Sequence, residues 1–369
     1  MKFRLYYFIV LLTFLIIGFT FESKGQGCVA VRNMSSWSLG ADSVQTKVWQ
    51  FSLNYRYFRS YKHFRGSHEE KHRVEEGSEV INHDNSLLLG IGYTLNNRWA
   101  LSAVIPYLNI DRSSLYEHYG NPTPSNPTLN PRFHTQARGL GDLRISTYYS
   151  ALQNKKINLT LGLGVKLPTG NYETKDHFHK KDSEGQDSLV YKVVDQSIQL
   201  GDGGLGIIVE FDLAYNFTHS IGAYASGLYL SNPRNTNGIL RSDNLTNGIQ
   251  RSNEFSVVDQ FVFRAGARYN VKGFQIALGI RYEGIPSEDL IGESQGFRRP
   301  GYIVSLEPSA LYTTGKHTFG VNVPIAMYRN RVQNTIDKER TEITGTFQNG
   351  DAAFADWLLS VTYAYRLQR

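Results

Sequence analysis

The sequence predicts an all-β fold, a closed antiparallel transmembrane β-barrel of about twelve strands. Three observations lead to this prediction. The 369 residues are rich in glycine and aromatic residues, with 34 Gly, 23 Tyr and 20 Phe. Apolar and polar residues alternate in twelve segments after residue 45, and the links between these segments are alternately short and long. Short turns at one rim and long loops at the other are typical of bacterial outer-membrane barrels.

Residues 1–25 have the pattern of an export signal. A short positive region precedes an apolar run from Leu5 to Phe21, and the small residues Ser23 and Gly25 follow it. Such a segment is normally removed during export. The alternative is a membrane anchor, because about 17 residues is the lower limit for a spanning helix.

Residues 26–45 precede the first alternating segment. We expect them to form either a periplasmic lead-in or a plug that folds into the lumen. Cys28 is the only cysteine of the chain, which excludes a disulfide framework, and it is an alternative site of lipid attachment. Once residues 1–25 are removed, the positive charge is too small to require a nucleic-acid partner.

The barrel is expected to occupy residues 46–369. No run after residue 45 reaches 18 consecutive apolar residues, so a helical membrane span is not predicted. Each alternating segment instead has the 9–11 or so residues that a tilted strand needs to cross a bilayer. We expect strands near 46–60, 85–95, 98–110, 139–152, 156–169, 204–217, 219–231, 257–270, 273–284, 302–313, 316–329 and 354–367.

The alternation fits two kinds of barrel. In 205–217, one face runs through Val209 and Phe211 and the other carries Glu210 and Asp212. A soluble barrel would turn the apolar face inward, whereas a membrane barrel turns it towards lipid. The export signal, the long loops and the aromatic residues near strand ends favour the membrane version, in the bacterial outer membrane with both termini in the periplasm. These aromatic residues are Trp99, Tyr107, Phe217, Tyr269, Tyr282, Tyr302, Tyr312 and Tyr365.

Two motifs carry a family resemblance. The first is the strand start Gly139-Leu140-Gly141-Asp142-Leu143-Arg144, and the second is the strand end Lys166-Leu167-Pro168-Thr169-Gly170. The chain resembles, best over 139–231, the outer-membrane family labelled as phenol-degradation (MetA pathway) transporters. The resemblance implies a barrel related to the long-chain fatty-acid and aromatic-hydrocarbon channels. Gly139, Gly141, Asp142, Pro168, Thr169 and Gly170 are expected to have structural roles, since glycine permits tight turns and close approach.

Charged and amide side chains on the polar faces are the candidates for lining the lumen. Opposed charges there would set a field that biases which solutes pass. Alternatively, they would form a salt-bridged filling that stiffens a narrow barrel. Barrels of about eight strands are filled and barrels of 16–18 strands are open, so twelve strands leave both interpretations open. The candidates are Arg144, Lys166, Glu210, Asp212, Gln260, Arg264, Arg268, Arg281, Glu283, Glu307 and Arg366.

The sequence contains no convincing enzymatic motif. The run His68-Glu69-Glu70-Lys71-His72 matches the HExxH pattern, but it lies in a charged loop without a third ligand, so neither catalysis nor a metal site is predicted. A phospholipase-type barrel would need a serine beside a histidine on the outer wall, and no such pairing stands out.

The sequence therefore predicts passive uptake of a small solute, hydrophobic or aromatic, without a cofactor. Its expected partners are outer-membrane lipid and that solute. The alternative is a structural or surface-interaction barrel with a plugged lumen, and an outer-membrane phospholipase is a weaker third hypothesis.

Overall fold

The structure is a computed structural model that describes residues 46–123, 129–241 and 253–368. The predicted signal 1–25 and the segment 26–45 with Cys28 lie outside the described residues.

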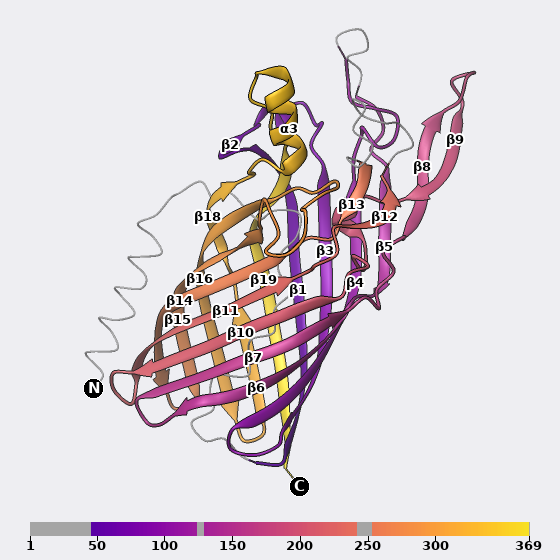
Figure 1. Ribbon diagram of the computed structural model, residues 1–369. Coiled ribbons are helices and arrows are strands. Elements are labelled where there is room, and N and C mark those ends of the chain that lie inside the picture. The colour runs from indigo at the N-terminus through magenta and orange to yellow at the C-terminus, as the bar shows by residue number, and fades with distance from the viewer. Residues whose placement is uncertain (1–45, 124–128, 242–252, 369) are drawn as a thin grey trace.

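Twelve antiparallel strands form a closed barrel, as the sequence predicts (Figure 1). Neighbours in the sequence are neighbours in the wall, and closure comes from β1 against β19, from Val48 opposite Gln368 to Phe64 opposite Ala352. The wall consists of β1 (Val48–Arg65), β3 (Ile81–Thr94), β4 (Trp99–Ser113), β6 (Leu143–Gln153), β7 (Ile157–Leu167), β10 (Gly206–Asn216), β11 (Ile221–Ser231), β14 (Gln260–Val271), β15 (Phe274–Ile285), β16 (Gly301–Thr314), β17 (His317–Asn322) continued by β18 (Ile325–Asn330), and β19 (Ala352–Gln368).

Two of the predicted strands are interrupted. The expected strand 139–152 is split into β5 (His134–Leu140) and β6, with Gly141 and Asp142 between them. Both halves pair with β4, and the register shifts by one residue across the break. The expected strand 316–329 is split before Ile325, at Val323 and Pro324, because proline cannot donate to the ladder.

The long connections contain structure of their own. Figure 1 shows α3 and the hairpin of β8 and β9 at the rim opposite the C-terminus. No helix of the described residues is long and apolar enough to span a bilayer. The additional elements are β2 (His68–Glu69), α2 (His72–Glu75), β8 (Lys175–Lys181), β9 (Asp187–Val193), the 3-10 helix η1 (Gln196–Ile198), β12 (Thr236–Leu240), β13 (Glu254–Ser256) and α3 (Thr335–Thr344).

The barrel is apolar outside and polar inside. Leu163 and Val209 point outward and are 58% and 55% exposed, whereas Glu283 and Ser305 point inward and are 0% exposed. The rim aromatics Trp99 and Phe217 are likewise exposed. A soluble barrel has the opposite arrangement, so the membrane version of the prediction is confirmed.

Candidate functional site: the lumen and its extracellular cavity

Four inward-facing charged residues meet at the middle of the barrel. Arg281 and Glu283 lie two positions apart on β15, so both face the lumen, and their side chains are 2.6 Å apart. Glu307 on β16 lies 3.5 Å from Arg281 and 3.2 Å from Arg264 on β14. We call Arg264, Arg281, Glu283 and Glu307 the central ion cluster. Each buried charge in it has an opposite charge as a direct partner.

Glu210 and Asp212 face the same lumen from β10, which β11 separates from β14. The hydroxyls of Tyr148 and Ser146, both on β6, donate to Glu210 over 3.1 and 3.3 Å. Glu210 is therefore held by neutral hydroxyl donors from β6.

Nearer the short turns, the inward charges are positive. Arg268 donates to Asn216 over 2.6 Å and to Gln275 over 3.5 Å, and Arg366 donates to Gln50 over 3.2 Å. The described strands carry no Asp or Glu on their inward faces from Arg268 to the short-turn rim. The described part of this end of the lumen therefore carries positive charge.

The two sequence motifs meet at the opposite end of the lumen. The carboxylate of Asp142 accepts the amide of Gly170 over 2.9 Å and that of Asp202 over 3.3 Å. The hydroxyl of Thr169 donates to the Gly141 carbonyl over 3.0 Å and accepts the Leu143 amide over 2.9 Å.

The glycines allow this close approach. A Cβ on Gly170 would lie 2.7 Å from the Leu200 carbonyl, and one on Gly139, whose φ is 155°, would lie 2.9 Å from a Leu200 methyl. These contacts hold the break between β5 and β6 against the end of β7.

Lys166 lies beside this junction rather than in open lumen. Its ammonium pairs with Asp202 and lies 3.8 Å from Asp142, and its side chain is almost fully buried. Lys166 therefore links the contacts between the two sequence motifs to the wall of a cavity.

The cavity lies just inside the extracellular mouth and has two kinds of wall. Its apolar wall consists of Leu88, Val104, Pro106, Leu200, Phe255, Val258 and Ile285. Its polar wall consists of Asp142, Arg144, Lys166, Gln196, Ser197, Gln199, Gly201, Asp202, Asn237, Ser256, Gln260 and Arg299. An apolar surface with a few polar groups that fix orientation is typical of small-molecule sites.

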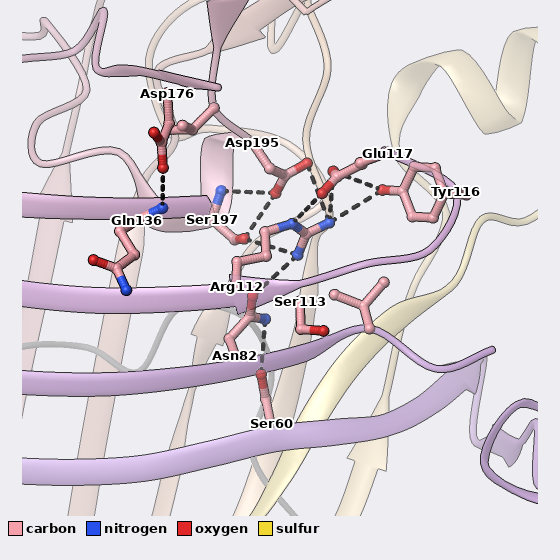
Figure 2. A network of polar contacts seen from close by, with 12 residues as sticks. Ser60, Asn82, Arg112, Ser113, Tyr116, Glu117, Gln136, Asp176, Asp195 and Ser197 are labelled. Atoms are coloured by element: carbon pink, nitrogen blue, oxygen red, sulfur yellow. Dashed lines mark hydrogen bonds and ion pairs between the residues drawn. The ribbon is translucent and has the colours of Figure 1, made fainter. Parts of the chain in front are cut away.

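A network of ion pairs holds the segment 194–201, which contributes to the cavity wall. Figure 2 shows the part of this network around Arg112. Arg112 at the end of β4 makes two bonds of 2.9 Å to Glu117 and lies 3.6 Å from Asp195. Arg299 makes two bonds of 2.8 Å to the same Asp195. We call Arg112, Glu117, Asp195 and Arg299 the mouth latch.

Asp195 is ionised in this setting. Its burial alone would raise the pKa of the carboxyl, but Arg112 and Arg299 outweigh the burial and hold the pKa well below its usual range. Ser197, whose amide and hydroxyl both bond to Asp195, lines the cavity, so the latch positions part of the cavity wall.

The candidates named from the sequence fall into three groups. Arg264, Arg281, Glu283 and Glu307 meet in the central ion cluster, with Glu210 and Asp212 nearby. Arg144, Lys166 and Gln260 line the cavity, while Arg268 and Arg366 lie towards the short turns.

Sequence analysis missed the mouth latch, because its residues fall in the expected long loops. A signal existed for one of them. Arg112 continues the period-two pattern of Leu108 and Ile110 beyond the expected end of that strand, and all three face inward. Asp195 and Arg299 have no comparable periodic pattern.

The HExxH run does not form a helical ligand pair. His68 lies in β2 and His72 begins the four-residue α2, so the two histidines do not share one helix. Over residues 46–123, 129–241 and 253–368, no three His, Cys, Asp or Glu side chains are grouped in a way that suits a metal ion.

Comparison with solved structures places the chain among outer-membrane barrels by fold. The chain is similar to an outer membrane channel from Pseudomonas putida F1, with a TM-score of 0.57 and 12% identity, over 92% of this chain and 100% of that one. A Pseudomonas putida toluene transporter aligns with a TM-score of 0.42 and 11% identity, over 89% and 91% of the two chains. A Pseudomonas aeruginosa FadL homologue aligns with a TM-score of 0.39 and 9% identity, over 87% and 90%.

No protein-family model matches the sequence, and no curated protein does. The first of the structural similarities agrees, at the level of fold, with the predicted resemblance to outer-membrane channels.

Proposed function

We propose that the protein is an outer-membrane channel for the passive uptake of a small hydrophobic or aromatic solute. The observation that carries the proposal is the two-sided cavity inside the extracellular mouth. Leu88, Val104 and Pro106 offer apolar contact, while Gln196 and Gln260 offer amide groups. A neutral aromatic molecule with one hydrogen-bonding group matches both walls. The shared fold with an outer membrane channel of Pseudomonas putida F1 supports the same proposal.

Filling the cavity tests this function. Val104 faces the cavity and Ile105, the next residue of β4, faces outward, so the pair forms a matched control. Val104→Trp should reduce uptake of radiolabelled benzyl alcohol, by cells carrying the protein, to the level of cells that lack it. Ile105→Trp should leave uptake unchanged, because aromatic side chains are tolerated on the lipid face. Equal uptake by both variants would show that the cavity is not part of the transport path.

A specific observation favours the second candidate, a structural barrel with a filled lumen. The central ion cluster joins β14, β15 and β16 with buried, mutually neutralised charges, as a stiffening filling would. Ion conductance across planar bilayers separates the two candidates, because a filled lumen passes no ions. We propose no enzymatic role, and the solubilised protein should release no fatty acid from phospholipid.

A further inference from the structure

Over the residues that the structure describes, the side chains of the short-turn rim carry only positive charge. Five short connections lie there, spanning 95–98, 154–156, 217–220, 272–273 and 315–316, and none of them contains Asp or Glu. Their cationic residues, together with the lysine before β1, are Lys47, Arg98, Lys155, Lys156, Lys272 and Lys316, and all of them are exposed. The long connections at the other rim carry both signs.

These cations lie beside the outward aromatic side chains. The guanidinium of Arg98 lies 5.8 Å from the ring centre of Tyr149 and donates to its hydroxyl over 3.3 Å. That ring lies 4.8 Å from the indole of Trp99. The ammonium of Lys156 lies 5.5 Å from the ring of Tyr215.

The same arrangement recurs further round the rim. Lys272 precedes the exposed Phe274, whose ring stacks 4.3 Å from Tyr312. Lys316 precedes His317, whose ring lies 5.2 Å from Tyr365.

Position and charge together indicate the partner. Aromatic rings of membrane proteins lie at the depth of the lipid head groups. Cationic side chains beside them therefore reach the lipid phosphates, and Lys and Arg near a membrane surface attract anionic lipid. None of these six cations forms a salt bridge with a carboxylate of the described residues, so their charge is available to lipid.

We propose that the short-turn rim is a binding collar for anionic phospholipid in the periplasmic leaflet. The collar consists of Lys47, Arg98, Lys155, Lys156, Lys272 and Lys316. It gives the barrel a preference for phosphatidylglycerol over zwitterionic lipid and fixes the depth of the periplasmic rim.

Lipid retention tests the collar. The full-length protein is reconstituted in equal mixtures of phosphatidylglycerol and phosphatidylcholine, extracted in mild detergent, and the retained lipids are counted by native mass spectrometry. The collar variant combines Lys155→Gln, Lys156→Gln, Lys272→Gln and Lys316→Gln. The control variant removes the same charge from the long loops by Lys71→Gln, Lys175→Gln, Lys181→Gln and Lys338→Gln.

The wild-type protein and the control variant should retain phosphatidylglycerol preferentially. In the collar variant this preference should be lower by at least about fivefold. Heat-dependent mobility on gels checks that each variant is folded. An equal loss of lipid preference in the collar and control variants would show that net charge alone causes the effect, and would overturn the proposal of a binding collar. Absence of any lipid preference in wild type, combined with collar-dependent binding to purified peptidoglycan sacculi, would assign the rim to the cell wall instead.

Discussion

The two ends of the lumen handle charge in different ways. From the middle of the barrel to the extracellular mouth, the central ion cluster and the mouth latch set buried guanidinium groups against carboxylates. Towards the short turns, Arg366 donates to the amide side chain of Gln50. A neutralised pair has little field beyond its own contact, whereas a cation among neutral groups keeps its field. From this difference we expect the first region to hold the structure and the second to influence any ion in the lumen.

The largest expected effect comes from removing one partner of the central ion cluster. Arg281→Met leaves Glu283 and Glu307 buried with one guanidinium fewer, which should lower the free energy of unfolding by about 3–5 kcal/mol. Arg366→Met removes a hydrogen bond to the neutral amide of Gln50 and should cost only about 1–3 kcal/mol. Urea unfolding in lipid vesicles measures both variants. Equal losses would show that the two ends of the lumen do not differ in this way.

Opening the mouth latch should have a smaller and more local effect. Asp195→Asn removes the charge that Arg112 and Arg299 share, and hydrogen bonds to charged groups contribute about 1.5–3 kcal/mol. Backbone amides of 194–201 should then exchange with solvent at least about tenfold faster, as measured by hydrogen–deuterium exchange. The amides of β14 should be unaffected. Unchanged exchange over 194–201 would mean that the latch does not hold this segment.

Ion selectivity should respond to charge reversal at Arg366 more than at Arg264. Arg264 lies 3.2 Å from Glu307 and is already neutralised by it, whereas Arg366 donates to the amide of Gln50. Arg366→Glu should shift the reversal potential in a salt gradient towards cation selectivity, and Arg264→Glu should shift it less. The opposite order would place the selective region in the central cluster.

The smallest effect concerns the docking of the hairpin formed by β8 and β9. His118 accepts the His179 amide over 3.0 Å and stacks on Phe178 at 5.4 Å. Burial lowers the pKa of His118 from 6.5 to about 4, and the nearby charges are Glu117, His179, Lys180 and Lys192. The undocked state therefore binds more protons between these two values, so docking is fully stable above 6.5 and weakens as the pH falls towards 4.

Limited proteolysis measures this weakening at pH values above and within that window. His118→Gln should remove most of the pH dependence, whereas His177→Gln, at an exposed position of the same hairpin, should preserve it. A hairpin equally resistant at every pH would contradict the assignment to His118.

Period-two alternation predicted the strands and which side chains share a face, while the export signal, the long loops and the aromatic residues near strand ends decided which face points inward. The same rule placed Arg281 and Glu283 on one face and Phe274 on the other, because a strand has only two faces. It does not predict the interruptions at Gly141 and Pro324, which depend on local backbone chemistry.

The mouth latch was beyond prediction for a different reason. Arg112 lies at the end of β4 and Asp195 in a long connection, and the two meet only after the loops fold over the mouth. No local pattern records that contact.

Single-channel current in planar bilayers, recorded with benzyl alcohol on the side of the long loops, tests the central claim most directly. A path through the cavity predicts discrete ion steps that the alcohol interrupts, and Val104→Trp should abolish the interruptions. A folded protein that stays silent, or whose current the alcohol leaves unchanged, would contradict a solute path through this lumen.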